Sequence, residues 1–230
     1  MKYLYVLLAF LIFSWPTHAQ NYKKEREKMV TKQISKRGVK DVHTLSALRK
    51  VERHLFVSPE YMHMAYDDGP LPIGYGQTIS QPYIVGFMTQ IIKPKPGHKI
   101  LEIGTGSGYQ AAVLAEIVDK VYTIEIVPEL AKTASDRLQK LGYDNVEVIR
   151  ADGYYGLEEQ APFDAIVVTA AAEHIPPSLI RQLKDGGRMV IPVGSPFLIQ
   201  TLMLVEKKKG KISTSSLMPV RFVPFTRSRE

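Results

Sequence analysis

A glycine-rich turn carries the clearest chemical signal in the sequence. It reads Leu101-Glu-Ile-Gly104-Thr-Gly106-Ser-Gly108-Tyr-Gln and includes the end of a short apolar run. Because glycine has no Cβ, such a turn lets the backbone pass tightly from a strand into a helix and lie close to a ligand. The third glycine comes one residue too early for the Gly-x-Gly-x-x-Gly motif of dinucleotide cofactors. The spacing therefore disfavours a pyrophosphate cofactor, and a plain strand–helix turn is the structural alternative.

Two acidic residues accompany the turn. Glu102 directly precedes the glycines, where a carboxylate would repel a pyrophosphate and favour a positively charged ligand. S-adenosylmethionine is such a ligand, since its sulfonium and ammonium groups are both cationic. Glu125 ends the next predicted strand, 21 residues beyond Gly104, and can accept hydrogen bonds from both ribose hydroxyls of an adenosine. That role would suit NAD as well as S-adenosylmethionine, so Glu125 alone does not distinguish them. Glu102 and the early Gly108 favour S-adenosylmethionine.

A third polar pair, Asp152-Gly153, ends the following predicted strand. The Asp152 carboxylate can accept a hydrogen bond from an adenine amino group, while Gly153 lets the chain turn beside the ring. Taken alone, the pair could also be a simple β-turn. Three such strand ends in succession favour a single cofactor site at the carboxyl edge of a sheet.

The elements that must position these residues alternate from position 99 onward. Nearly unbroken apolar runs are typical of parallel strands buried on both faces. After Pro196 the pattern changes to strands without helices, joined by the polar segment 207–216, which indicates an antiparallel edge. We therefore predict a doubly wound α/β fold with a mostly parallel, Rossmann-like sheet and an antiparallel C-terminal edge. Strands are expected at 99–103, 121–126, 146–149, 163–169, 188–193, 198–206 and 217–223, and helices at 110–118, 128–141 and 176–183.

The region before the sheet divides into two parts. Apolar residues in 21–53 fall at helical spacing in two segments, which Gly38 separates as a helix stop. Residues 59–82 show no clear period and are dense in turn formers, yet they are rich in Tyr, Met, Leu and Ile. Such a long apolar loop is expected to be functional rather than disordered.

The first 19 residues are predicted to be a signal peptide. Lys2 is the only charge before Lys23, residues 3–15 form an apolar run, and the small residues Thr17 and Ala19 suit cleavage before Gln20. An uncleaved membrane anchor is the alternative, although the run is short for a spanning helix. Residues 20–230 would then form one domain, with a helical cap and active-site loop (20–97) and a cofactor-binding core (98–230). We expect a periplasmic or secreted protein without stable membrane association after cleavage. A cytoplasmic protein starting near Met29 is the alternative.

Composition limits the possible chemistry. The chain has 230 residues, of which 45% are hydrophobic and 23% charged, values typical of a globular domain. The absence of cysteine excludes thiol nucleophiles, iron–sulfur clusters and cysteine-based zinc sites. The histidines lack metal-ligand spacing, so no metal site is predicted. The net charge of +7 is concentrated near the chain ends, without the aromatic interleaving or motif spacing of nucleic-acid binders, and no nucleic-acid partner is expected.

The block Gln77-Thr-Ile-Ser-Gln-Pro82, the glycine-rich turn Gly104–Gly108 and further motifs within residues 67–224 resemble those of the protein-L-isoaspartate O-methyltransferases. Many methyltransferases share the glycine motif, whereas the block Gln77-Thr-Ile-Ser-Gln-Pro82 is specific to this family. Family members usually act on cytosolic proteins, so the leader is a departure from the family pattern. Further resemblance lies in Leu71-Pro-Ile-Gly, Pro162-Phe-Asp-Ala-Ile-Val-Val-Thr-Ala-Ala171, Gln182-Leu-Lys-Asp-Gly-Gly-Arg188, Ile191-Pro-Val-Gly194 and Arg221-Phe-Val-Pro224.

The resemblance implies the fold of class I S-adenosylmethionine-dependent methyltransferases and a protein-repair activity. Such an enzyme methylates the free carboxylate of L-isoaspartyl residues, with D-aspartyl residues as a second candidate substrate. The ester then cyclises to a succinimide, which hydrolyses partly to normal aspartate. Matching the family motif position by position assigns Ser80 as the active-site residue and Gln77, Thr78 and Ile79 to the cleft. By the same matching, Ser107, Glu125, Asp152 and Gly153 are cofactor-contacting positions, and the glycine-rich turn itself adds Glu102, Gly104, Gly106 and Gly108.

This chemistry makes modest demands on the protein. A carboxylate with a pKa of about 4 is already ionised at neutral pH, so no strong general base is needed. Ser80 would orient the carboxylate rather than attack covalently, since no Gly-x-Ser-x-Gly elbow surrounds it, and a turn or cap serine is the structural alternative. The other functions considered are a methyltransferase of small molecules or RNA, a non-enzymatic binding module and, least favoured, a nicotinamide dehydrogenase.

Overall fold

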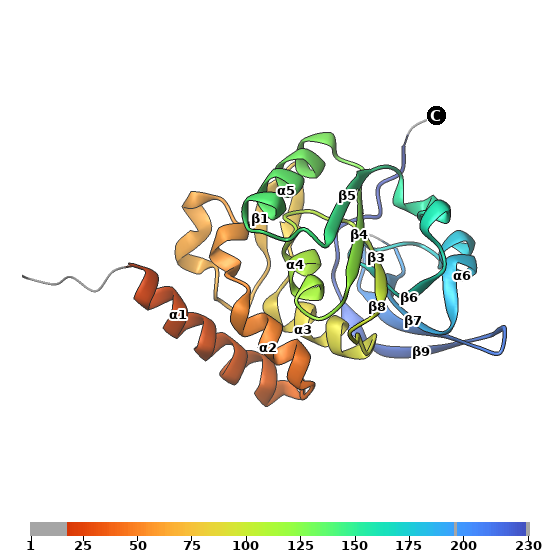
Figure 1. The fold of residues 1–230 in the computed structure, drawn as a ribbon, viewed down its shortest axis with the longest axis horizontal. Helices are drawn as coiled ribbons and strands as arrows, with labels where there is room; N and C mark the ends of the chain where they lie inside the picture. The colour runs from red at the N-terminus through yellow and green to blue at the C-terminus, as the bar shows by residue number, and fades with distance from the viewer. Residues whose placement is uncertain (1–17, 196, 229–230) are drawn as a thin grey trace, which may run out of the picture.

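A central seven-stranded sheet organises the computed structural model, which describes residues 18–195 and 197–228 (Figure 1). The strand order is β5-β4-β3-β6-β7-β8-β9, parallel from β5 to β7 and antiparallel at the β7–β8 and β8–β9 pairs. This arrangement confirms the predicted doubly wound fold with an antiparallel C-terminal edge. The strands are β3 (Lys99–Ile103), β4 (Lys120–Glu125), β5 (Val146–Arg150), β6 (Phe163–Val168), β7 (Leu183–Val193), β8 (Gln200–Lys208) and β9 (Lys211–Val220).

Helices cover both faces of the sheet. Successive side chains of β3 point to opposite faces, so Ile100 joins one hydrophobic cluster, while Leu101 and Ile103 join the other. The first cluster also contains buried side chains of the N-terminal helices and of α3, α4 and α5; the second contains Leu179 of α6. The helices packed on the sheet are α3 (Pro82–Ile91), α4 (Tyr109–Ala115), α5 (Pro128–Lys140) and α6 (Pro177–Gln182).

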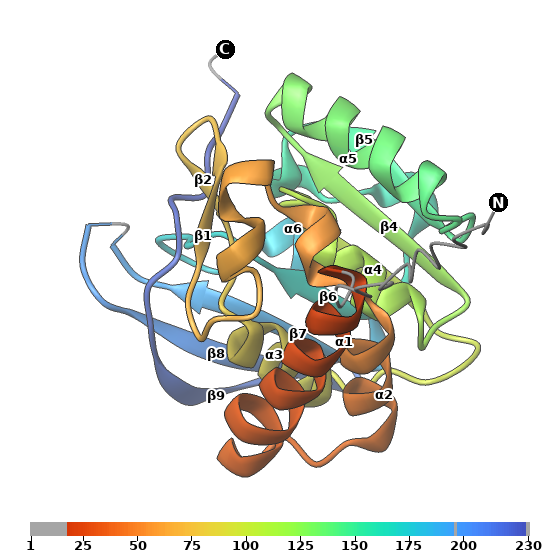
Figure 2. The same ribbon diagram turned by 90° about the vertical axis from the view of Figure 1, so that its left-hand side faces the viewer.

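The N-terminal helices form a cap beside the sheet (Figure 2). Helix α1 (His18–Lys28) continues through a π-helical turn and a 3₁₀ turn to Gly38, whose φ of 100° ends it as predicted. Helix α2 (Val42–Lys50) begins at Asp41, whose side chain accepts a hydrogen bond from the Thr44 N–H. None of the helices in the described ranges is long and apolar enough to cross a membrane. The predicted apolar leader segment, 3–15, lies outside the described residues.

The predicted loop 59–82 is more ordered than its sequence indicates. A 3₁₀ helix (Pro59–Met64) precedes a hairpin of β1 (Leu71–Gly74) and β2 (Gln77–Ile79), and α3, which was not predicted, starts at Pro82. These strands are too short to show a period of two. Strand β9 also starts earlier than predicted, at Lys211, because its exposed polar residues resemble a loop in composition.

Candidate active site

Ten of the twelve predicted site residues line one cavity at the carboxyl edge of the sheet. The turn after β3, the end of β4 and the residue after β6 form its floor, and the β2–α3 connection forms one wall. The cavity encloses about 780 Å³, including the part open to solvent. The site residues predicted from the sequence that line it are Gln77, Thr78, Ile79, Ser80, Glu102, Gly104, Gly106, Ser107, Glu125 and Gly153.

The glycine turn is held tightly against the end of β6. Gly104 has a φ of 95°, and its N–H donates to the Ile124 carbonyl at 2.8 Å. The Thr169 hydroxyl donates to the carbonyl oxygens of Gly104 (2.7 Å) and Ile103 (3.0 Å). A Cβ at position 104 would lie only 2.4 Å from Thr169 Oγ1. The turn therefore requires glycine both for its backbone conformation and for this close approach.

Glu125 is fixed at the end of β4 with its carboxylate against the glycine turn. Its Oε2 accepts from the Gly106 N–H at 2.8 Å and its Oε1 from the Val127 N–H at 2.9 Å. The residue is 5% exposed and lines the cavity. Because each carboxylate oxygen can accept a second hydrogen bond, this geometry leaves acceptor capacity for a pair of ligand hydroxyls.

Glu102 is a fully buried carboxyl group beside the cavity. Its Oε2 accepts from the Thr123 hydroxyl at 2.5 Å, whereas Oε1 has no partner among the described residues. Burial is the main cause that raises the pKa of Glu102 to about 8; the Thr123 hydrogen bond opposes this rise and the charge of Glu125 adds to it. Without a ligand, the group therefore holds its proton at neutral pH. A cationic ligand would favour the ionised form.

This buried carboxyl predicts a pH dependence of stability. Between pH values of about 4.5 and 8 the unfolded chain loses the Glu102 proton while the folded chain keeps it. The folded state then binds more protons, so this group lowers the free energy of unfolding as pH rises, by at most about 1.4 kcal/mol per pH unit. Urea titrations across this window should show that Glu102→Gln removes the contribution, whereas Glu129→Gln, an exposed control, keeps it. Equal pH slopes for wild type and Glu102→Gln would contradict the assignment.

Ser80 lies where two cavities meet. It follows β2 and precedes α3, and it is half-buried. A second cavity opens on the other side of the β2–α3 connection, with Arg37, Gln81 and Arg221 among its lining residues. The two cavities share four residues, Thr78, Ser80, Thr169 and Val223. A ligand in each cavity would therefore meet its neighbour beside the Ser80 hydroxyl.

Two predicted residues do not line the cavity. Gly108 directly precedes α4 as its N-cap with a φ of 87°, and a Cβ there would lie 3.1 Å from Leu138 Cδ1, so glycine has a structural role at the helix start. Asp152 is not among the residues that line the cavity, and its carboxylate binds Arg227 and Ser228. Its neighbour Gly153 does line the cavity, where a Cβ would lie 2.3 Å from a methyl carbon of Ile103. The structure thus places the backbone of this strand end at the site, but not the Asp152 carboxylate.

One wall of the cavity was not predicted from the sequence. After β9 the chain returns across the carboxyl edge, and residues 223–226 line the cavity. Hydrogen bonds to both backbone groups of Ala171 hold this segment: Ala171 N–H to the Val223 carbonyl (2.8 Å) and Phe225 N–H to the Ala171 carbonyl (2.9 Å). The motif Arg221-Phe-Val-Pro224 was visible in the sequence, but no spacing rule connects it with the glycine turn more than one hundred residues earlier.

The polar groups that line the cavity suit a cationic ligand that contains adenosine. Glu125 offers acceptors for ribose hydroxyls, and Glu102 has a buried oxygen with no partner in the described part of the chain. The glycine turn lines the same cavity. Within the described ranges, no group of three or more His, Asp or Glu side chains is placed to hold a metal ion.

Comparison with known proteins gives a consistent result. The family model for protein-L-isoaspartate(D-aspartate) O-methyltransferase (PCMT) matches residues 24–230. Protein-L-isoaspartate O-methyltransferase 2 of Polaromonas sp. (strain JS666) is 60% identical over 190 residues, which cover 82% of this chain and 90% of the relative. Protein-L-isoaspartate O-methyltransferase of Opitutus terrae is 55% identical over 226 residues, which cover 97% of each chain.

Solved structures agree with the sequence relatives. A structure of a protein-L-isoaspartate O-methyltransferase superposes with a TM-score of 0.80 at 30% identity, covering 86% of this chain and 65% of that chain. A Plasmodium falciparum protein described by the same activity, crystallised with S-adenosyl-L-homocysteine, superposes with a TM-score of 0.75 at 26% identity. That alignment covers 90% of this chain and 99% of that chain. The chain therefore belongs to the protein-L-isoaspartate(D-aspartate) O-methyltransferase family.

Proposed function

We propose that this protein is a repair enzyme that methylates the free α-carboxylate of L-isoaspartyl residues in damaged proteins and peptides. The first cavity would hold S-adenosylmethionine and the second cavity the isoaspartyl residue. The observation that carries this proposal is the shared wall of Thr78, Ser80, Thr169 and Val223, which brings the two cavities together at the Ser80 side chain. Membership of the family supports the same activity.

The cofactor cavity would be organised by two carboxyl groups. S-adenosylmethionine, when bound, supplies a methyl group activated by a sulfonium charge. Glu125 would accept the ribose hydroxyls with the acceptor capacity left by the Gly106 and Val127 N–H groups. Glu102 would ionise beside the cationic ligand, since an opposite charge lowers a raised carboxyl pKa. Gln77, Thr78 and Ile79 of β2 would close the cavity on the substrate side.

The acceptor would need orientation rather than activation. Its carboxylate is already anionic at neutral pH, so the protein has no proton to remove before methyl transfer. Ser80 would donate a hydrogen bond to one carboxylate oxygen and direct the other toward the methyl group. Holding two reactants in line at roughly 3 Å can supply much of the barrier reduction. Arg37 and Arg221 in the second cavity would attract the negative charge of the substrate.

Paired peptides test this activity. One peptide carries L-isoaspartate and its twin carries L-aspartate at the same position, and both are incubated with the protein and methyl-labelled cofactor. We expect base-labile label on the isoaspartyl peptide alone, because only that isomer presents a free α-carboxylate at this position. Label on both peptides, or on neither, would contradict the proposal. Label on RNA or a small molecule would instead support the alternative methyltransferase functions.

We also propose that residues 1–19 are a cleaved export signal, on the strength of their apolar run and the small residues before Gln20. We propose further that the mature chain is one domain, which consists of a cap with the active-site loop (20–97) and a cofactor-binding core (98–230). Mass spectrometry of the protein purified from its native source should find Gln20 at the N-terminus. A native N-terminus at Met29 would show that the protein is cytoplasmic, as is usual for the family.

A further inference from the structure

A C-terminal strap, defined here as residues 221–228, crosses the carboxyl edge of the sheet. It lines the first cavity through residues 223–226, and its backbone pairs with Ala171 beyond β6. Closer to its start, the Phe222 N–H donates to the Gln200 side chain at 2.9 Å. These bonds fix the first half of the strap. The second half, which follows the cavity wall, is held by different contacts.

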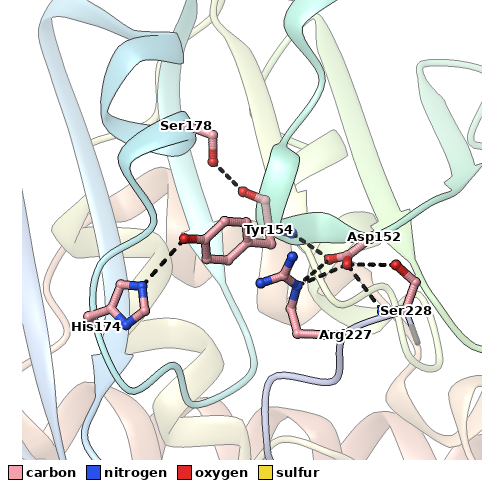
Figure 3. Close-up of polar contacts among 6 residues, drawn as sticks. All are labelled: Asp152, Tyr154, His174, Ser178, Arg227 and Ser228. Atoms are coloured by element: carbon pink, nitrogen blue, oxygen red, sulfur yellow. Dashed lines mark hydrogen bonds and ion pairs between the residues drawn. The ribbon is translucent and has the colours of Figure 1, made fainter. Parts of the chain in front are cut away.

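Asp152 fastens the end of the strap (Figure 3). Arg227 Nε donates to Asp152 Oδ2 at 2.9 Å and to Oδ1 at 3.2 Å. Ser228 adds its N–H (3.1 Å) and its hydroxyl (3.0 Å), both to Oδ2. The Asp152 side chain is only 6% exposed, compared with 42% for Arg227. Burial alone would raise the pKa of Asp152, but these hydrogen bonds and one from the Tyr154 N–H lower it.

The Arg227 guanidinium also stacks on an aromatic ring that is itself held in place. Its Cζ lies 3.7 Å from the centre of the Tyr154 ring. The Tyr154 hydroxyl lies 3.4 Å from His174 Nε2, and its carbonyl accepts a hydrogen bond from the Ser178 hydroxyl. Figure 3 shows Arg227 between Tyr154 and Asp152. The strap therefore ends on a platform built from residues that follow β5 and β6, outside the cavity itself.

We propose that Arg227 is a positioning residue that fastens the strap over bound S-adenosylmethionine and sets how long the cofactor stays bound. The inference rests on the proposed function for the identity of the ligand. In this arrangement Asp152 serves the strap rather than the adenine amino group. Two observations support that role. Gly153 lines the cavity and Asp152 does not, and each oxygen of Asp152 already accepts at least two hydrogen bonds, whereas each oxygen of Glu125 accepts one.

Variants of Arg227 test the fastening. Arg227→Gln removes the charge and weakens the stacking, and Arg227→Lys keeps the charge but loses the planar fork. Arg181→Gln, at an exposed arginine of α6, is the matched control because it removes the same charge outside the strap. The readouts are the dissociation rate of S-adenosylhomocysteine, kcat and the KM values of both substrates. The hydrogen-exchange rate of the Phe225 amide measures how often the strap opens and needs no ligand.

The ion pair between Arg227 and Asp152 is partly exposed, so we expect its loss to have a moderate effect on cofactor binding. We predict that Arg227→Gln speeds dissociation of S-adenosylhomocysteine and raises the KM for the cofactor by about 3- to 10-fold. Arg227→Lys should recover part of this change, and exchange at Phe225 should be faster in Arg227→Gln. Both kcat and the KM for the peptide should stay within about two-fold, as should all values for Arg181→Gln.

Two results would overturn the inference. Unchanged dissociation and exchange in Arg227→Gln would show that the strap needs no fastening. Tighter binding of S-adenosylhomocysteine by Arg227→Gln would show that Arg227 competes with adenine for Asp152. If the wild-type protein binds no S-adenosylhomocysteine, the proposed function fails, but hydrogen exchange still decides whether Arg227 holds the strap.

Discussion

Replacing Glu125 by glutamine is expected to weaken the binding of S-adenosylhomocysteine by about 100-fold or more. Hydrogen bonds to a charged group contribute about 1.5–3 kcal/mol each, and the loss of one or two of them gives an effect of this size. The amide has only one oxygen, so it cannot accept from Gly106 and Val127 and also from a ribose. Calorimetric titration with S-adenosylhomocysteine measures the effect.

The matched control for this variant is Glu129→Gln. Glu129 is exposed in the first turn of α5, four residues from Glu125, so the same charge is lost without any change in the cavity. Its affinity for S-adenosylhomocysteine should stay within about two-fold of wild type. If Glu125→Gln remains folded and binds as tightly as this control, Glu125 does not hold the ribose.

Ser80→Ala is expected to lower kcat by about 100-fold, because the carboxylate loses the hydrogen bond that orients it and a misplacement of about 1 Å can cost this much. The alanine keeps the shape of the β2–α3 connection but removes the hydroxyl at the junction of the two cavities. Affinity for S-adenosylhomocysteine should hardly change, because the ribose and glycine-turn contacts are intact. Steady-state rates with a saturating isoaspartyl peptide measure the loss.

Two further variants distinguish orientation from general damage. Ser80→Thr keeps the hydroxyl and should retain more activity than Ser80→Ala. Ser213→Ala removes an exposed hydroxyl of β9 and should leave kcat unchanged. A kcat for Ser80→Ala close to that of wild type would assign Ser80 the structural alternative, a turn serine between β2 and α3.

The sequence was most informative where local rules determine structure. The glycine turn after β3 and the position of Glu125 could be predicted because parallel strands place their carboxyl ends at one edge of the sheet. The apolar runs of β3, β4 and β6 identified the buried strands within one residue at each end. Glu102 was predicted to lie beside the ligand, but its complete burial and its raised pKa came from the structure.

The rest of the site depends on contacts between distant segments. By its residue type and its place at a strand end, Asp152 was predicted to bind adenine. In the structure its carboxylate binds Arg227, which lies 75 residues away in the sequence. The same applies to residues 223–226, which reach the cavity only because β8 and β9 return the chain across the sheet edge. Strands β1 and β2 were not predicted because strands of only four and three residues are too short to show an alternation of hydrophobic and polar residues.

A crystal structure with S-adenosylhomocysteine and an isoaspartyl peptide bound together tests the central claim most directly. The account predicts the adenosine between Glu125 and Gly153, with its sulfur facing the wall shared by the two cavities. The peptide α-carboxylate should lie in the second cavity, within hydrogen-bond distance of the Ser80 hydroxyl. An adenosine bound elsewhere, or a carboxylate remote from Ser80, would contradict the account.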